Sequence, residues 1–123
     1  LANMELIERE GGVGGAARLG EILLARLHAM KAKHPQIGCV DGKGMVAAVA
    51  CGKPGTTEPD ADLAWAAVQE SLQRGVLMFS PVGFGGAAIK ICPPLNIPED
   101  ALAESLDVFE EAFAAALAQT VRA

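Results

Sequence analysis

Apolar residues recur at helical spacing in three segments of the chain: Val13–Lys33, Ala61–Arg74 and a final segment that opens with Pro98-Glu99-Asp100. Intervals of three and four residues place these positions on one face of a helix, which then packs against a core. We therefore expect three amphipathic helices. Their apolar stripes are Leu19, Leu23, Leu27 and Met30, then Trp65, Val68 and Leu72, then Leu102, Leu106, Phe109, Phe113 and Leu117.

The residues that flank these segments support the same helices. His34-Pro35 ends the first one, because the residue before proline is driven out of the helical region. Thr57 or Asp60 can cap the second helix, and Gly75 can close it in the left-handed conformation. Leu1–Glu10 also has helical character before two glycines interrupt it.

Short apolar runs between the helices predict strands, since Gly and Pro bound each of them. The glycine-rich turn Asp41-Gly42-Lys43-Gly44 joins the first two runs as a hairpin, because no helix follows it as a phosphate loop would require. An irregular loop, Ser80–Gly86, joins the last two. The four predicted strands are Ile37–Val40, Met45–Cys51, Val76–Phe79 and Ala87–Cys92.

The last predicted strand contains the residue that most needs an explanation. Its alternation places Ile89 and Ile91 on one face and Lys90 on the other. A lysine in the middle of an otherwise apolar strand, opposite the core face, is therefore a candidate functional residue.

The predicted order is helix, two strands, helix, two strands, helix. This order is typical of an α+β fold, with a small, mostly antiparallel sheet of three to four strands and helices on one face. The 123-residue chain shows no linker or repeat, so we expect residues 1–123 to form a single domain.

The charge and hydropathy of the chain argue against two classes of partner. The formal net charge is −5 and no basic cluster is present, which disfavours binding to nucleic acids or anionic membranes. The longest apolar stretch, Ala112–Ala118, is too short to span a bilayer. We expect no nucleic-acid or membrane partner.

The cysteines and histidines do not form a recognisable metal or catalytic set. Cys39, Cys51 and Cys92 contain no C-x-x-C pair, and an odd number of thiols indicates reduced cysteines in a cytoplasmic protein. His28 and His34 lack ligand spacing, and His34 is better explained as a cation beside a helix C-terminus. We expect no metal site and no complete catalytic machinery.

Three stretches together resemble the C-terminal end of class III (omega-amino-acid) aminotransferases, which are fold-type I enzymes. They are HPQIGCVDGKGMV, QRGVLMFSPVGFGG and AAIKICPPLNIPEDALAESLDVFEEAF. The family has an I-G-D-V-R-G-x-G-L-M strand-turn-strand, then a helix ending in R-G-x-L-L, then a strand of the type V-[IL]-R-[IFL]-x-P-P-L and a final amphipathic helix. The resemblance covers nearly the whole chain in the right order.

The resemblance implies an enzyme that moves an amino group from an amine or amino acid to a 2-oxo acid. In this family the pyridoxal phosphate and the lysine that holds it belong to a large N-terminal domain. None of the lysines here lies in that motif: Lys31, Lys33, Lys43, Lys53 and Lys90. The resemblance thus implies a C-terminal small domain that is inactive alone, does not bind the cofactor, contacts the missing large domain and belongs to a homodimer in the intact enzyme.

The resemblance also assigns a possible role to Lys90. It stands where many members have an arginine that binds the substrate carboxylate, but a lysine cannot reproduce the two-pronged geometry of a guanidinium. Cys39 and Asp41 replace an aspartate and an arginine of the family pattern. Phe84 and the neighbouring glycines are further candidates for lining the mouth of the active site.

Two other functions agree with the pattern. One is a free-standing, ferredoxin-like regulatory module that binds a small metabolite, and the other is a structural or dimerisation element without a ligand. The enzyme-fragment hypothesis differs from both because it predicts exposed apolar residues at Ser80–Gly86 and Leu1–Ile7.

Overall fold

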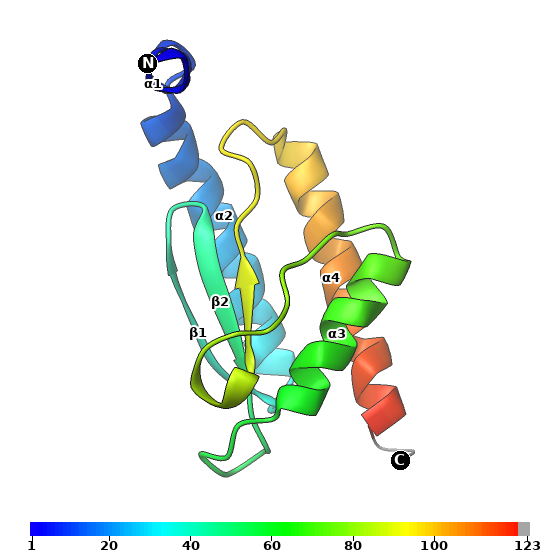
Figure 1. Ribbon diagram of the computed structural model, residues 1–123. Helices are drawn as coiled ribbons and strands as arrows, with labels where there is room; N and C mark the ends of the chain where they lie inside the picture. Colours follow the sequence, from blue (N-terminus) through cyan, green and yellow to red (C-terminus); the bar gives the residue numbers. More distant parts are fainter. Residues whose placement is uncertain (121–123) are drawn as a thin grey trace.

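A computed structural model describes residues 1–120 and consists of helices packed against a small sheet (Figure 1). The strands form one antiparallel sheet in the order β1-β2-β3. The predicted α+β class is confirmed, with three strands. In chain order the elements are α1 (Ala2–Arg9), α2 (Gly12–Lys33), β1 (Ile37–Lys43), β2 (Val46–Cys51), α3 (Ala61–Gln73), the short 3-10 turn η1 (Phe84–Gly86), β3 (Ala88–Ile91) and α4 (Glu99–Thr120).

The helices cover one face of the sheet, as predicted, and the core lies between them. Helix α2 packs on β1 and β2, while α3 packs on β2, β3 and along α4. Figure 1 shows α2 behind the sheet and the α3–β3 connection (residues 74–87) crossing in front of it. The largest fully buried side chains include Leu23, Leu27, Met30, Phe109 and Phe113.

The cross-strand register separates the two faces of the sheet. Val40 pairs with Val49, and Val49 pairs with Ile89, so these buried side chains form one row on the core face. The neighbouring row runs from Asp41 through Ala48 to Lys90. Because successive residues of a strand point to opposite faces, this second row lies on the open face. The predicted orientation of Lys90 is confirmed.

A glycine allows α2 to approach the β1–β2 hairpin very closely. An added Cβ on Gly20 would lie 2.4 Å from the carbonyl oxygen of Gly44. No side chain larger than hydrogen fits there without a backbone shift. Gly44 itself has a φ of 57°, a left-handed conformation that glycine adopts without steric cost. The pair fixes the distance between helix and sheet.

The predicted strand at Val76–Phe79 is wrong, because this run forms no ladder with β3. Val82 and Ala88 do exchange backbone hydrogen bonds, at 2.8 and 2.9 Å. Continuing that register would turn Phe79 to the core face and Met78 to the open face. The structure has the reverse, since Met78 packs against the core and Phe79 is 59% exposed. The run is one residue out of phase with the bridge, so the strand does not form.

The predicted core face of α3 is also wrong in part. Trp65 is 49% exposed and Leu72 is 57% exposed, although Val68 is buried as expected. The buried face instead includes Ala64, Ala67 and Ser71, each one position before a residue of the predicted stripe. The ends of α3 are confirmed. The Asp60 carboxylate accepts a hydrogen bond from Leu63 N at 3.0 Å, and Gly75 has a φ of 90°.

Candidate functional site

Lys90 lies at the centre of β3 with its side chain exposed on the open face of the sheet. Its Nζ atom is 5.4 Å from the centroid of the Phe79 ring, a distance at which a cation is attracted to an aromatic face. Within residues 1–120 it forms no ion pair with a carboxylate. Phe79 holds the ammonium group on the side of the α3–β3 connection, and the charge remains available to an anion.

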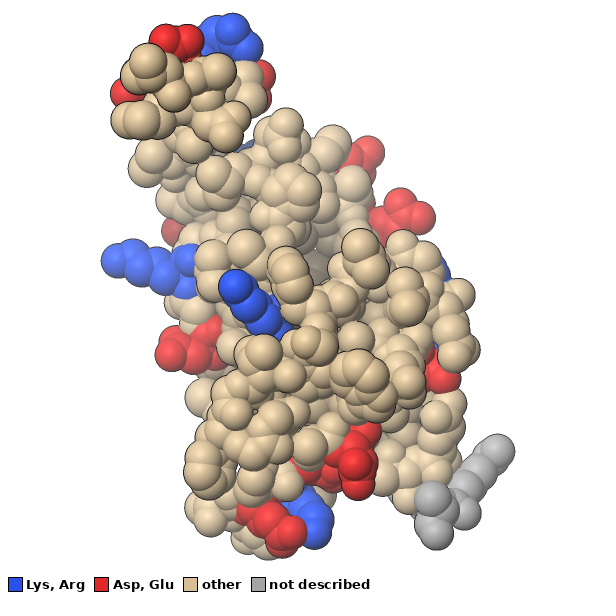
Figure 2. Space-filling model, in the orientation of Figure 1, with Lys and Arg blue, Asp and Glu red and all other residues tan. Residues whose placement is uncertain are grey.

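A cleft of about 270 Å³ opens beside Lys90, between the α3–β3 connection, the end of β3 and α4. We call it the Lys90 cleft. Figure 2 shows this side of the molecule as a surface on which uncharged residues predominate, with a hollow near its centre. Among residues 1–120, Lys90 is the one charged residue that lines the cleft. Its other lining side chains include Met78, Phe79, Ile97, Leu102, Leu106 and Phe109.

A second, shallower depression lies on the open face itself and is lined by Asp41, Ala48, Val82 and Lys90 among others. The Asp41 carboxylate is exposed and accepts a hydrogen bond from Gly42 N at 2.8 Å. Asp41 and Lys90 stand two strands apart, so their Cα atoms are separated by about 9.5 Å at normal strand spacing. Cys39, the other departure from the family pattern, is exposed on the same strand as Asp41.

Phe84 is separated from both of these depressions. Its side chain is 84% exposed, and it lines neither the Lys90 cleft nor the open-face depression. The next residue, Gly85, has a φ of 64°, and an added Cβ would lie 2.5 Å from the Pro59 ring. The loop is therefore seated against the start of α3 and presents Phe84 outward.

The contacts and burial of the remaining candidate residues indicate structural roles. His34 follows the last turn of α2, and its ring centroid lies 5.3 Å from that of Phe113. Burial, together with the nearby Asp60 carboxylate, raises the pKa of the Cys51 thiol to about 12, so this thiol is not a nucleophile at neutral pH. In residues 1–120 no three potential ligands gather to hold a metal ion, and no helix there could cross a membrane.

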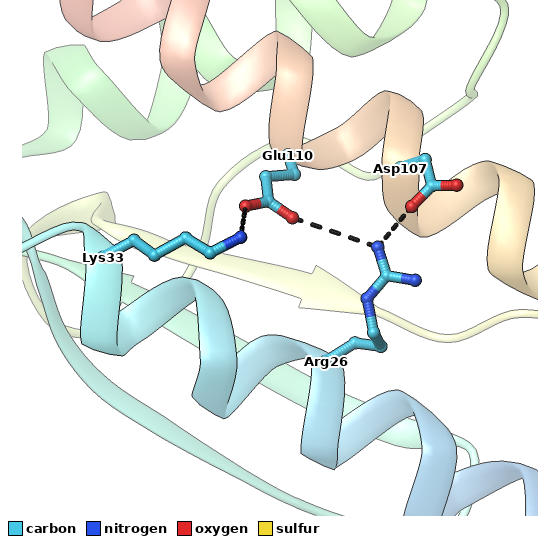
Figure 3. A network of polar contacts seen from close by, with 4 residues as sticks. All are labelled: Arg26, Lys33, Asp107 and Glu110. Carbon is cyan, nitrogen blue, oxygen red and sulfur yellow. Dashed lines mark hydrogen bonds and ion pairs between the residues drawn. The ribbon is translucent and has the colours of Figure 1, made fainter.

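Sequence reasoning missed the polar contacts that join α2 to α4. Arg26 contacts both Asp107 and Glu110, and Lys33 Nζ lies 2.6 Å from Glu110 Oε1 (Figure 3). Arg18 pairs with Glu99 about two turns earlier on both helices. The signal was present in the sequence, because Arg18, Arg26 and Lys33 recur at intervals of eight and seven residues along α2 and acidic residues are frequent along α4.

The residues beside Lys90 do not fit pyridoxal phosphate. Its phosphate needs several donors, such as a helix N-terminus or a second cation, whereas Lys90 is the one charged residue in the described part of the chain that lines its cleft. Two other lysines, Lys33 and Lys53, are ion-paired with Glu110 and Glu58. We therefore derive no cofactor chemistry from these residues.

The comparisons with known proteins agree on one family. The model for class-III aminotransferases matches residues 1–113. A 4-aminobutyrate aminotransferase of Mycobacterium bovis is 35% identical over 108 residues, which cover 88% of this chain and 24% of the relative. An isoleucine 2-epimerase of Lentilactobacillus buchneri is 34% identical over 116 residues, covering 94% and 25%.

The fold comparison gives the same result. A transaminase structure from the marine bacterium Virgibacillus superposes with a TM-score of 0.87 at 26% identity, over 97% of this chain and 28% of that chain. The chain thus spans about a quarter of the length of the curated relatives it matches. The family match over almost the whole chain, together with this fold, means that the protein belongs to the class-III aminotransferase family.

Proposed function

We propose that these residues are the C-terminal small domain of a larger, pyridoxal-phosphate-dependent aminotransferase, with the cofactor domain upstream. The observation that carries the proposal is the class-III match over residues 1–113. Relatives named as aminotransferases of 4-aminobutyrate and 5-aminovalerate support transfer of an amino group from an amine or amino acid to a 2-oxo acid. The cofactor, bound by the upstream domain, supplies the electron sink of this reaction.

The contribution of this chain would be to bind the substrate carboxylate through Lys90. The ammonium group is exposed, is held at one side by the Phe79 ring and has no carboxylate partner in the described part of the chain. A lysine attracts a carboxylate as a point charge and imposes less orientation than an arginine fork would. The expected consequence is a carboxylate site that tolerates a wider range of substrate poses.

The exposed apolar residues support a contact with the absent domain. Val82 is 48% exposed and Phe84 is 84% exposed on the α3–β3 connection, and Leu1 and Met4 of the N-terminal segment are 97% and 64% exposed. Exposed apolar side chains that lie close together mark interaction sites, and Val82 and Phe84 lie on one loop while Leu1 and Met4 lie at the start of a separate helix. By the same family analogy we propose a homodimer. The exposed free thiols of Cys39 and Cys92 support a cytoplasmic location.

A second candidate is amino-acid epimerisation with the same cofactor. The observation that favours it is the 34% identity to an isoleucine 2-epimerase over 94% of the chain. The full gene product separates the two reactions. A transaminase converts a 2-oxo acid to the amino acid only when an amino donor is present, whereas an epimerase inverts one amino acid without a 2-oxo acid.

The first test concerns where the cofactor binds. The 123-residue chain is titrated with pyridoxal phosphate, followed by absorbance, borohydride trapping and peptide mapping. We expect no adduct confined to one lysine, whereas the full gene product should carry one upstream of these residues. A stoichiometric adduct on a single lysine of this chain would overturn the proposal and favour a free-standing module.

The second test concerns Lys90 in the full gene product. Lys90→Met keeps most of the length of the side chain and removes its charge. We expect KM for carboxylate-bearing donors to rise about tenfold while the kcat for an amine without a carboxylate is unchanged, and Lys90→Arg to restore the KM. An equal loss on both donors would contradict a carboxylate role.

A further inference from the structure

We propose that Gly11–Gly15 is a hinge on which α1 swings toward Leu95 and closes the depression that lies between them. This depression is bounded by α1, the start of α2 and the connection from β3 to α4, and we call it the Leu95 depression. The inference does not depend on the reaction proposed above, because it concerns the motion of one helix within residues 1–120.

The start of α2 lacks the features that usually hold a helix N-terminus. Its N-cap residue, Gly11, has no side chain to accept a hydrogen bond, and no acidic residue lies in the first turn. Three of the four residues 12–15 are glycines, and only proline is a weaker helix former. By contrast, α3 has the Asp60 cap and Asp62 in its first turn. We therefore infer that the first turn of α2 opens more easily than that of α3.

Packing does not require two of these glycines. An added Cβ on Gly14 or on Gly15 would meet no atom of residues 1–120 within 4 Å, whereas on Gly20 it would meet the backbone of the hairpin. The first buried residue of α2 is Leu19, one turn beyond the hinge. Glycine at positions 14 and 15 thus contributes backbone freedom and no close approach.

Helix α1 is not held by the core. None of its residues is buried, and it packs mainly against α2. Figure 1 shows α1 beyond the end of the sheet, and Figure 2 shows it as a lobe that projects from the body of the molecule. Gly11 joins α1 to α2 with a φ of 62°. A few residues at the end of an element can absorb the dihedral changes of such a swing.

The two walls of the Leu95 depression are complementary. On α1, Leu6 and Ile7 are each 37% exposed, and on the opposite wall Leu95 is 44% exposed. Closing the depression removes these apolar surfaces from water, which favours the closed position. Glu10 and Asn96 line the same depression, and the Asn96 amide can donate a hydrogen bond to the Glu10 carboxylate as the walls approach.

The swing would also move the contact with the upstream domain. Leu1 and Met4, which we propose to meet that domain, are 97% and 64% exposed and lie outside the lining of the depression. They stay accessible when Leu6 and Ile7 close on Leu95. Helix α1 would then carry this contact relative to the sheet.

The first test measures the strength of the hinge by amide hydrogen exchange of the 123-residue chain. The amide of Gly15 donates to Gly11 O at 2.9 Å, and the amide of Ala64 donates to Asp60 O at 3.2 Å at the equivalent position of α3. We expect a protection factor about tenfold lower at Gly15 than at Ala64. Gly14→Ala and Gly15→Ala should each raise protection at position 15 about fivefold.

The second test asks where α1 moves. Ile7→Cys and Leu95→Cys are combined in a chain that carries Cys39→Ser and Cys92→Ser, since these two thiols are exposed, and the pair is oxidised with oxidised glutathione. The matched control is Glu8→Cys with Leu95→Cys, because Glu8 is the next residue of α1 but lies outside the lining of the depression. We expect the intramolecular disulfide to form about tenfold faster from position 7 than from position 8, since the two Cβ atoms must come together.

The alanine variants connect the two tests. Gly14→Ala with Gly15→Ala should slow cross-linking from position 7 about fivefold or more, because a firmer first turn of α2 restricts the swing. Thermal unfolding confirms that this double variant is folded.

Three results would overturn the inference. Equal protection at Gly15 and Ala64 would mean that the start of α2 is as firm as a capped helix. Equal cross-linking from positions 7 and 8 would mean that α1 frays without a direction. A cross-linking rate that the alanines leave unchanged would place the motion outside Gly11–Gly15. Neither experiment involves the cofactor, so failure of the hinge and failure of the proposed function are distinguishable.

Discussion

The helix pair α2–α4 and the α3–β3 connection show two different kinds of protein surface. Along the helix pair, basic side chains of α2 meet acidic side chains of α4 about every two turns of α2, and Figure 3 shows those of Arg26 and Lys33. Along the connection, Leu77 is 83% exposed, Phe84 is 84% exposed, and Lys90 beside it has no carboxylate partner among residues 1–120.

The difference indicates which of the two surfaces needs no further partner to cover it. Paired charges over a buried seam are typical of a face that meets solvent, because the seam needs no further cover. Where exposed aromatic and aliphatic side chains surround an unpaired cation, apolar surface is in contact with water and the charge has no partner. The connection is therefore the surface on which we expect the upstream domain and the substrate to act.

The largest effect should come from matched phenylalanine truncations on the two surfaces. Phe113 is fully buried where α4 meets the core, while Phe84 is 84% exposed. We expect Phe113→Ala to lower the free energy of unfolding by about 3–5 kcal/mol and Phe84→Ala by less than about 0.5 kcal/mol. Urea denaturation of both variants measures the difference.

The comparison would break if Phe84→Ala destabilised the isolated chain by more than about 1 kcal/mol. The exposed loop would then contribute to the fold itself and would be a poor candidate for a docking surface. If Phe113→Ala fails to fold, Phe113→Leu gives a smaller change of the same sign.

A smaller effect should come from the glycine contact beneath α2. The Cβ of Gly20→Ala would lie 2.4 Å from the Gly44 carbonyl oxygen, whereas Gly15 on the same helix has no atom within 4 Å of that position. We expect Gly20→Ala to destabilise by about 1–3 kcal/mol and Gly15→Ala to stabilise by up to about 1 kcal/mol. Thermal unfolding of both variants gives the sign, and equal effects would mean that the hairpin moves freely.

The sequence predicted the helices well because their signals are local. The apolar stripe of α2, the Asp60 cap and the left-handed Gly75 are each read from a few neighbouring residues. The strand at Val76–Phe79 failed because the bridge between Val82 and Ala88 sets a register with which this run is out of phase, and alternation within the run itself does not reveal that register. The exposure of Trp65 likewise depends on which face of α3 packs against the other elements, and the buried face is one position away from the predicted stripe.

The candidate site also has one feature that the local sequence predicted and others that it did not. Alternation within β3 was sufficient to place Lys90 on the open face. The Phe79 ring beside it and the Lys90 cleft could not be predicted, since they require the distances between β3, α4 and the α3–β3 connection. The family resemblance assigned a possible role to the position and gave no information about its surroundings.

The pH dependence of stability should report on the packing between α3 and α4, because Glu70 of α3 accepts a hydrogen bond from Gln119 of α4. Hydrogen bonds from Arg74 and then Gln119 lower the pKa of Glu70 from its ordinary value of 4.5. A carboxyl whose pKa is lower in the folded state adds stability above its unfolded pKa, and this is lost as pH falls through the folded pKa. We expect the stability difference between wild type and Glu70→Gln to be largest near neutral pH and to shrink below about pH 4.5. A difference that stays constant down to pH 2 would contradict the assigned shift.

The smallest effect should come from the ion pairs between α2 and α4. Arg26 contacts Asp107, whose side chain is 63% exposed, so water and salt weaken the attraction. A double-mutant cycle of Arg26→Met and Asp107→Asn should give a coupling of about 0.2–1 kcal/mol that declines in 0.5 M salt. Lys31→Met serves as the unpaired control on the same helix. A coupling above about 2 kcal/mol, or one that salt does not change, would mean that the pair is shielded from solvent. The α2–α4 surface would then be an interface as well, and the contrast with the α3–β3 connection would no longer identify where the rest of the protein docks.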